Sequence, residues 1–387
     1  MKIIHSTDDW LALTKSWIYD QVRFMPDGVE QGVWCNRLVE GPHTSWNGEV
    51  FVQKHGIYSK VVSILYCRLG RFMPRPKSIV NFKNYDVIFS HFGYWAWHDY
   101  LYVRGLPLKK IVRFYGYDVG LIPKQPGWME KYKRIFDEYD LMLCEGPHMA
   151  NELENIGAPR EKIRWIHLGI DSDYLAKELM PTEELFNPLC ILVAGTFTEK
   201  KGIEYALEGI LEFACETGYP VHLTLIGDSP PSLSKELCRK KEVEHLIEKM
   251  HLLKNVEIVK KGYVPLDELN AIMKKNLIFI SPSIEANNGD IEGGFPVTLI
   301  YAAANGMILI GTDHCDLPEI VRDQVNGYIC EQKSSQSISE CLKKIININQ
   351  ASLSDKRKAS LQLASKDFNA KLLANQMCKI LSEVVMA

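Results

Sequence analysis

The sequence contains no apolar run that approaches the roughly 20 residues needed to span a bilayer. Its N-terminus, MKIIHSTDDW, has one lysine followed by polar and acidic residues, where a signal peptide would carry an apolar stretch. Strong basic charge is absent as well, since the net charge is −3, which argues against a protein that binds nucleic acid through its whole surface. We therefore expect a cytoplasmic protein with no nucleic-acid partner.

Motifs of several common enzyme classes are also missing. No Gly-x-Gly-x-x-Gly follows a strand and no Gly-x4-Gly-Lys-Ser/Thr is present, so a nicotinamide dehydrogenase and a P-loop NTPase lose their main support. There is no Gly-x-Ser-x-Gly nucleophile elbow. The ten cysteines stand singly, without a Cys-x-x-Cys, and the histidines show no metal-ligand spacing. We expect buried, reduced cysteines and no bound metal.

What is present is the composition of a soluble globular protein, with 46% hydrophobic and 24% charged residues. A chain of 387 residues exceeds one ordinary core and suggests two domains. In the C-terminal half, short apolar runs alternate with amphipathic segments of helical length. The predicted strands are 190–197, 221–228, 255–264, 277–283 and 307–313, and the predicted helices are 203–216, 235–253, 266–276, 296–306 and 337–347.

The N-terminal half repeats this pattern less regularly. Apolar runs at 87–93, 110–116, 141–146 and 163–171 predict strands, and 128–139 and 148–157 predict helices. The fold class is therefore α/β, with two Rossmann-like domains that each contain a parallel sheet and face a cleft. We place the domains at 1–175 and 190–365, the linker within 176–189, and a C-terminal helix at 366–387 that packs back on the first domain.

A basic stretch runs from Lys54 to Arg113, where eleven basic residues face only two acidic ones. Aromatic residues are interleaved with these charges, among them Phe72, Phe82, Tyr94, Trp95, Trp97, Tyr100 and Tyr102. One interpretation is a solvated face above core aromatics. The other is a surface that makes peripheral contact with anionic lipid headgroups at the inner face of the membrane, or with an anionic acceptor. RNA binding has less support, because no RNA-binding motif accompanies the charge.

The most informative segment is SPSIEANNGDIEGGFPVTLIYAAANG, residues 281–306. A strand leads into a polar loop with Asp290 and Glu292, and Gly293-Gly294 precedes a helix. The glycines and the exposed N–H groups of the helix start favour a phosphate, and the carboxylates can accept hydrogen bonds from sugar hydroxyls. This combination fits a nucleotide-sugar. The alternative is an ordinary turn with solvated acids.

A second segment, AGTFTEKKGIEYA at 194–206, places a strand end at Gly195 and Lys200-Lys201-Gly202 at the start of a helix. A lysine at a helix N-terminus is unfavourable for the helix dipole, so its presence suggests an anionic partner. The alternative is a common surface turn.

Together and in this order, the segments resemble family 4 of the retaining glycosyltransferases, which have the GT-B fold. The matching pieces are FYGYD (114–118), GAPREKIRWIHLGID (157–171), AGTFTEKKG (194–202), LTLIGD (223–228), residues 281–306, and GTDHCDLPEIVRDQVNGYI (311–329). The resemblance covers roughly residues 85–345. It is closest to the branch with a Gly-Asp-x-Glu-Gly-Gly-x-Pro loop, which is usual in surface-polysaccharide assembly.

The resemblance implies roles for individual residues. Lys201 matches the lysine that neutralises the donor diphosphate, and Glu292 matches the first acid of a paired-glutamate motif that binds the donor sugar. The candidate catalytic residues are Lys201, Glu292 and Asp118. The candidate donor-binding residues are Gly195, Thr196, Lys201, Asp290, Glu292, Gly293, Gly294, Phe295 and Tyr301, and the candidate acceptor-side residues are His91, Tyr115 and Asp118.

Three of these positions depart from the family pattern. Thr196 stands where the family usually has arginine, Tyr301 stands in place of the second glutamate, and Tyr115 replaces a histidine. Each lost charge-assisted hydrogen bond typically removes about 1.5–3 kcal/mol. These changes do not affect the predicted fold, but they bear on the efficiency of catalysis.

The function implied by the resemblance is retaining transfer of a hexose from a nucleotide-diphosphate sugar to a glycan or lipid-linked acceptor. The nucleotide would bind mainly to the 190–365 domain and the acceptor to the 1–175 domain. No cofactor is required in the mechanism proposed for the family, in which a donor phosphate oxygen takes the acceptor proton. The alternatives are a catalytically degenerate member that binds a partner or a glycan and, with less support, a sugar-nucleotide epimerase.

Overall fold

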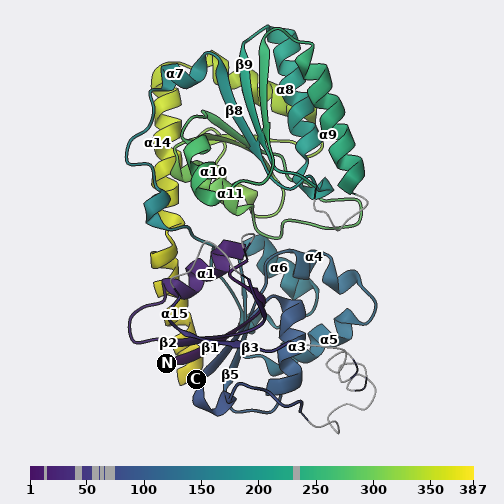
Figure 1. The fold of residues 1–387 in the computed structure, drawn as a ribbon, viewed down its shortest axis with the longest axis vertical. Coiled ribbons are helices and arrows are strands. Elements are labelled where there is room, and N and C mark those ends of the chain that lie inside the picture. Colours follow the sequence, from purple (N-terminus) through teal and green to yellow (C-terminus); the bar gives the residue numbers. More distant parts are fainter. Residues whose placement is uncertain (13–14, 40–45, 55–60, 62–64, 66–74, 230–235) are drawn as a thin grey trace. The chain divides into compact units, whose positions relative to one another are not determined.

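The computed structural model describes residues 1–387 except 13–14, 40–45, 55–60, 62–64, 66–74 and 230–235, and it does not describe the side chains of 236–238. The chain divides into two compact units (Figure 1). Unit 1 comprises residues 1–169 and 370–387, and unit 2 comprises residues 170–369. The stretch 176–189, expected as a linker, lies within unit 2 and contains the short helix α7, Thr182–Phe186.

Unit 1 is built on a parallel sheet of seven strands in the order β3-β2-β1-β4-β5-β6-β7. The strands are β1 (Lys2–Trp10), β2 (Glu30–Leu38), β3 (Glu49–Val52), β4 (Val87–His91), β5 (Lys109–Arg113), β6 (Leu141–Cys144) and β7 (Ile163–Trp165). Successive residues of the central strands are buried on opposite faces, as with Ile3 and Ile4. Helices therefore cover both faces of the sheet.

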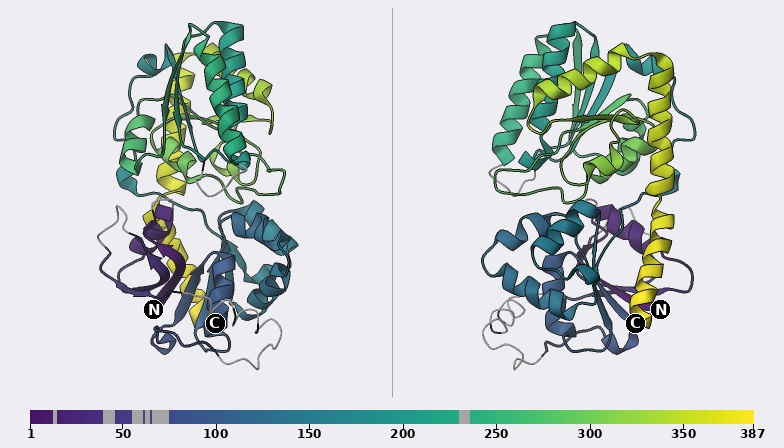
Figure 2. Two further views of the ribbon diagram at one scale, coloured as in Figure 1. Left: turned by 45° about the vertical axis from the view of Figure 1, so that its right-hand side comes forward. Right: turned by 180° about the vertical axis from the view of Figure 1, so that it is seen from behind.

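One face of this sheet packs against α15 (Ala370–Met386), which contacts α1 (Ser16–Arg23). The second view in Figure 2 shows α15 lying along unit 1. The opposite face packs against α3 (Gly93–Val103), α5 (Trp128–Glu138) and α6 (Pro147–Asn155). The short helix α4 (Tyr117–Gly120) follows β5.

Unit 2 contains a parallel sheet of six strands in the order β10-β9-β8-β11-β12-β13. The strands are β8 (Leu189–Ala194), β9 (Val221–Ile226), β10 (Val256–Lys261), β11 (Ile278–Ser281), β12 (Ile308–Thr312) and β13 (Gly327–Cys330). Helices α8 (Ile203–Thr217), α9 (Glu236–His251) and α13 (Ser335–Asn347) pack on one face. The remaining helices are α10 (Leu266–Met273), α11 (Val297–Ala304), α12 (Leu317–Ile320) and α14 (Gln350–Asp367).

Two parallel sheets flanked by helices confirm the predicted α/β class. The predicted strands and helices of the C-terminal half each correspond to an observed element. The sequence analysis did not predict β1, β2, β3, α1, α3 or α4 in unit 1, nor α7, α12, α14 or β13 in unit 2. Among the described residues, no helix is long and apolar enough to cross a membrane.

Candidate active site

The ends of β8 and β11 in unit 2 bring Lys201 and Glu292 into direct contact. Lys201 ends the short helix at Glu199–Lys201 that follows β8, and its Nζ lies 2.8 Å from Glu292 Oε1. The Ser283 hydroxyl donates to the same Glu292 oxygen at 2.9 Å. The Glu292 side chain is only 7% exposed and that of Lys201 20%. Two of the predicted catalytic residues therefore form a largely buried ion pair.

The environment of Glu292 keeps it ionised. Burial by itself raises the pKa of Glu292, but the charges of Lys201 and Lys200, with hydrogen bonds from Lys201 and Ser283, outweigh burial and leave this pKa below its usual value. A buried carboxylate that is charged at neutral pH can accept hydrogen bonds from ligand hydroxyls.

Lys200 forms a second link to the same loop. Its Nζ donates to Asp290 Oδ1 and to the Ile291 carbonyl, both at 3.2 Å. Burial lowers the pKa of Lys200, but the neighbouring carboxylates of Glu292 and Asp290 raise it overall. Lys200 and Lys201 therefore form ion pairs with Asp290 and Glu292 of the 285–292 loop. The sequence analysis noted the Lys-Lys pair but assigned a role only to Lys201.

The glycine turn follows directly after Glu292. Gly293 has a φ of +82°, which favours glycine, and the Gly294 carbonyl accepts from the Asp316 N–H at 3.3 Å. Phe295 is buried against Phe368, with ring centroids 5.4 Å apart. The Glu292 N–H donates to His314 Nε2 at 3.3 Å, so His314 positions the loop.

The other donor-side candidates divide into two groups. Gly195 lies beside Lys201, because a Cβ at Gly195 would be 3.8 Å from the Lys201 side chain. Thr196 is next to it in the loop after β8 and is partly exposed. Tyr301 is only 4% exposed and packs edge-on against Tyr174, with ring centroids 5.4 Å apart. The structure therefore brings Gly195, Lys201 and Glu292 together, whereas Tyr301 lies inside the helix packing.

Gly202 fixes the position of Lys201. It has a φ of +58°, and a Cβ there would lie 2.2 Å from the Pro282 carbonyl oxygen. Gly202→Ala should therefore destabilise unit 2, since the backbone carrying Lys201 must move. Gly218→Ala is a matched control, because Gly218 has a φ of +67° but nothing within 4 Å of the added Cβ. We expect a loss of about 1 kcal/mol for the control and a larger loss for Gly202→Ala in urea unfolding. Equal losses would contradict this interpretation.

In unit 1 the acceptor-side candidates lie at the carboxyl ends of β4 and β5. Asp118 is fully buried, and its two oxygens accept from the backbone N–H groups of Gly93 at 2.7 Å and Tyr115 at 2.9 Å. Burial raises the pKa of Asp118 to about 6, against the effect of these backbone hydrogen bonds. Asp118 thus joins the two loops that follow β4 and β5.

His91 and Tyr115 belong to a buried hydrogen-bonded chain. His5 Nε2 lies 3.1 Å from Gln31 Oε1, His5 Nδ1 lies 3.2 Å from His91 Nε2, and His91 Nδ1 lies 2.6 Å from the Tyr115 hydroxyl. Because the Gln31 oxygen can only accept, His5 donates to it, His91 donates to His5, and Tyr115 donates to His91. The chain therefore requires both histidines to be neutral. The sequence analysis did not identify His5, which lies in a strand that it did not predict.

The hydrogen-bonded chain of His5, His91 and Tyr115 should make the folded protein less stable in acid. Burial lowers the pKa of His5 to about 4, so the unfolded chain binds a proton below pH 6.5 that the folded chain does not. Stability should fall as the pH drops from 6.5 towards 4, with His5 contributing up to about 3 kcal/mol. Urea unfolding of His5→Gln between pH 7 and pH 4.5 should show a shallower loss than the parent protein. His245→Gln, at an exposed site, should leave the slope unchanged.

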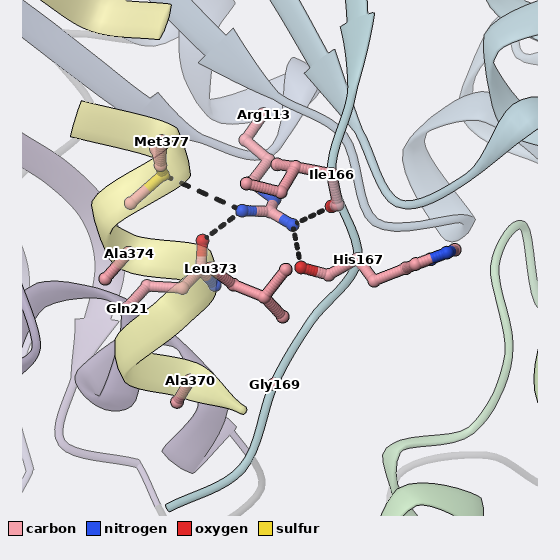
Figure 3. A pocket seen from close by; sticks show the side chains of 9 residues that line it. All are labelled: Gln21, Arg113, Ile166, His167, Gly169, Ala370, Leu373, Ala374 and Met377. Atoms are coloured by element: carbon pink, nitrogen blue, oxygen red, sulfur yellow. Dashed lines mark hydrogen bonds between the residues drawn. The ribbon is translucent and has the colours of Figure 1, made fainter. Parts of the chain in front are cut away.

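Arg113 is almost fully buried, with its guanidinium carbon 5.7 Å from the centroid of the Tyr115 ring. Figure 3 shows the residues that surround this guanidinium. The guanidinium donates to Gln21 Oε1 at 2.7 Å and to the Ile166 carbonyl at 2.5 Å, and it contacts Met377 of α15. The adjoining cavity of about 10 Å³ has room for roughly one water molecule. Arg113 therefore links α15 to the sheet. The cavity beside it is too small to hold a sugar.

Burial and pairing also account for other members of the basic stretch. Lys110 is buried and pairs with Glu138, and Lys109 pairs with Asp140. Lys54, Arg75, Lys77 and Lys83 are exposed, whereas Lys60, Arg68 and Arg71 lie outside the described residues.

The described residues include no group of three or more His, Cys, Asp or Glu arranged to bind a metal ion. None of the cysteines with described side chains forms a disulfide, and Cys67 and Cys238 lie outside that set.

Two family models match the chain. Residues 178–361 match the model described as Glycosyl transferases group 1, and residues 28–174 match the model described as Glycosyltransferase Family 4. An Escherichia coli K12 protein, named as a colanic acid biosynthesis glycosyltransferase, is 26% identical over 69% of this chain. The amylovoran biosynthesis glycosyltransferase of Erwinia amylovora is 25% identical over 77% of the chain and 70% of its own length. The chain spans only 63% of the length of the E. coli protein.

Solved structures share the fold over nearly the whole chain. HepE of Anabaena in complex with UDP has a TM-score of 0.75 and 15% identity, with 99% of this chain and 100% of HepE covered. A glycosyltransferase from Rickettsia africae has a TM-score of 0.74 and 15% identity, with coverages of 99% and 98%.

Proposed function

Because the chain belongs to glycosyltransferase family 4, which has the GT-B fold, we propose that it is a retaining transferase acting on a nucleotide-diphosphate sugar. The acceptor is a glycan or a lipid-linked sugar. The names of the relatives, which concern colanic acid and amylovoran biosynthesis, support a role in assembling a surface polysaccharide or glycoconjugate. The observation that carries the proposal is the buried ion pair of Lys201 and Glu292 beside the glycine turn at 293–294.

In the proposed reaction, the bond between the anomeric carbon and the donor phosphate oxygen breaks, and a bond to the acceptor hydroxyl forms on the same face of the sugar. Lys201 and the N–H groups at the start of α11 stabilise the charge that develops on the leaving diphosphate. Glu292 and Asp290 accept hydrogen bonds from sugar hydroxyls, and Gly195 allows the diphosphate to approach the backbone. A donor phosphate oxygen takes the acceptor proton, so the reaction needs no metal.

Four donor-side positions have more limited roles in this proposal. Thr196 offers a hydroxyl to the diphosphate in place of a cation. Gly294 and Phe295 line the turn that faces the sugar. Tyr301 is buried against Tyr174, so it supports α11 from within and does not replace a carboxylate. In this proposal Lys201 is therefore the main side chain that binds the diphosphate.

Calorimetric titration of the full chain with UDP, GDP and ADP tests the proposal, and a product assay with nucleotide-sugars and lipid-linked acceptors follows. Binding of one nucleotide, with turnover of the matching sugar donor, is expected. Binding without turnover would favour the degenerate alternative motivated by Thr196, Tyr115 and Tyr301. If no nucleotide binds at millimolar concentration, the proposed donor site is wrong.

We also propose that part of the basic stretch makes peripheral contact with anionic lipid. Gln53 hydrogen-bonds to the backbone of Lys77 and Ile79, which brings the strand end at Val52–Lys54 next to 77–79. Val52 and Ile79 are exposed apolar residues beside the exposed Lys54 and Lys77. Lysines beside apolar side chains suit an anionic membrane surface.

Co-sedimentation with phosphatidylglycerol-containing vesicles should therefore weaken about thirtyfold in a Lys54→Gln/Lys77→Gln double variant, since each lysine near such a surface contributes about 1 kcal/mol and two are lost. Lys241→Gln/Lys254→Gln removes two exposed lysines of unit 2 and should bind as the parent protein does. Equal binding of both variants would exclude this surface.

A further inference from the structure

The segment 312–316, at the carboxyl end of β12, contacts the backbone of Glu292 and of the glycine turn that follows it. The Glu292 N–H donates to His314 Nε2 at 3.3 Å, and His314 is buried, with only 5% of its surface exposed. The Asp316 N–H donates to the Gly294 carbonyl, also at 3.3 Å. Glu292 and the glycine turn are therefore hydrogen-bonded to the end of one neighbouring strand.

The same strand end also acts on the side chain of Glu292. The Thr312 hydroxyl donates to the Ser283 carbonyl, and the Ser283 hydroxyl in turn donates to Glu292 Oε1 at 2.9 Å. Lys201 Nζ lies 2.8 Å from Glu292 Oε1 and 2.9 Å from Oε2. The carboxylate of Glu292 therefore points towards Lys201 and Ser283, whereas its backbone N–H points towards His314.

Cys315, the next residue of this segment, has a strained backbone. Its φ is +51°, which is unfavourable for a residue with a side chain. The Leu317 N–H closes the turn by donating to the His314 carbonyl at 3.1 Å, and Cys315 Sγ lies 3.2 Å from His314 Nε2. Burial raises the pKa of Cys315 to about 12, although hydrogen bonds from the backbone N–H groups of Gly293 and Glu292 act in the opposite direction. Cys315 is therefore a neutral thiol packed against the start of the glycine turn.

The hydrogen bond to His314 requires an acceptor atom at one defined reach. Because the Glu292 N–H donates to Nε2, the His314 ring carries a proton on Nδ1 and none on Nε2. A buried N–H group without an acceptor is unfavourable, so loss of Nε2 would let the backbone at Glu292 turn towards another partner, and the carboxylate would turn with it. The position of the Glu292 carboxylate therefore depends on His314, which is not among the proposed donor ligands.

We propose that His314 is a positioning residue for the donor sugar: by accepting the Glu292 N–H, it orients the Glu292 carboxylate towards the sugar hydroxyls. In the proposed function, Lys201 and the N–H groups at the start of α11 bind the diphosphate, whereas the hydrogen bond of His314 acts on Glu292, which binds the sugar. His314 therefore affects recognition of the sugar and has little effect on recognition of the nucleoside diphosphate. This inference rests on the proposed transferase function and adds a residue to its donor site.

Two amide variants of the full chain test this role. The side-chain oxygen of glutamine reaches about as far as His314 Nε2 and can accept the Glu292 N–H, whereas asparagine is too short to do so. Calorimetry uses UDP with UDP-glucose, GDP with GDP-mannose and ADP with ADP-glucose, and the pair that binds the parent protein is then compared in the variants. His314→Asn should lower the affinity for the nucleotide-sugar about tenfold and the affinity for the nucleoside diphosphate less than about twofold. His314→Gln should bind both within about threefold of the parent protein.

Ser360→Ala is the control for a general loss of stability in unit 2. Ser360 is fully buried in α14 and donates to the Met307 carbonyl at 2.7 Å, at the opposite end of β12 from His314. Its substitution removes a buried hydrogen bond, so it should lower the midpoint of urea unfolding while both affinities stay unchanged.

Two results would overturn the positioning role of His314. One is an equal loss of affinity for nucleotide and nucleotide-sugar in His314→Asn, and the other is equal affinities of His314→Asn and His314→Gln. Nucleotide binding and turnover by the parent protein would then leave the proposed transferase function in place. If the parent protein binds none of these probes, the transferase function fails, and the role of His314 fails with it.

Discussion

Replacement of Lys201 by methionine is expected to lower kcat at saturating nucleotide-sugar about a hundredfold or more. Lys201 is the cation beside Gly195 and the glycine turn, and Thr196 contributes no charge there. The charge that forms on the leaving diphosphate would therefore lose its main partner. The measurement is steady-state turnover with the sugar of whichever nucleotide binds in calorimetry. Lys254→Met, at an exposed lysine of unit 2, is the control and should retain full activity.

A structural effect must be separated from this catalytic one. Removing Lys201 leaves the buried Glu292 carboxylate without its closest cation, and breaking a buried pair typically costs about 3–5 kcal/mol. The double variant Lys201→Met/Glu292→Gln removes both charges and should recover most of the stability of the parent protein. The double variant should stay inactive although it is folded, because it lacks both Lys201 and the proposed sugar ligand Glu292. Activity of the double variant within a few-fold of the parent would refute the proposed role of Lys201.

Substitution of Asp118 by asparagine is expected to destabilise unit 1 by about 2–3 kcal/mol, because hydrogen bonds to a charged acceptor are worth about 1.5–3 kcal/mol each. Both Asp118 oxygens accept from backbone N–H groups, and an amide NH₂ in place of one oxygen would face an N–H donor. Urea unfolding measures the loss. Asp137→Asn, at an exposed position of α5, should change stability by less than about 0.5 kcal/mol.

The effect of Asp118→Asn should also depend on pH. The folded pKa of Asp118 is raised to about 6, above the value of the unfolded chain, so the folded protein takes up a proton first as the pH falls. The stability that Asp118 contributes through this proton uptake is therefore fully present below pH 3.8 and is lost as the pH rises through 6. The stability difference between the parent protein and the variant should widen on going from pH 7 to pH 4. If Asp118 were instead in contact with substrate, turnover would fall sharply while stability stayed the same at every pH.

Strands β8, β9, β11 and β12 of unit 2 could be predicted because each is a short apolar run that is almost entirely buried. The first strands of unit 1 could not be predicted in that way. The middle of β1 contains His5, Ser6 and Thr7, all of which are fully buried. Two of them have distant partners, Asp99 for the Ser6 hydroxyl and His91 for His5. A periodicity argument treats polar residues as exposed, so it misses a strand whose polar side chains find partners elsewhere in the fold.

The sequence by itself determined the α/β class, the parallel sheets and the resemblance to a transferase family, because these depend on local apolar runs and short motifs. The tertiary structure alone decided which motif residues meet. Lys201 and Glu292 are far apart in the chain and contact each other only because β8 pairs with β11. It also decided which candidates are buried, such as Asp118, His91 and Tyr301. Burial is set by the neighbours that the folded chain supplies, and no single segment contains that information.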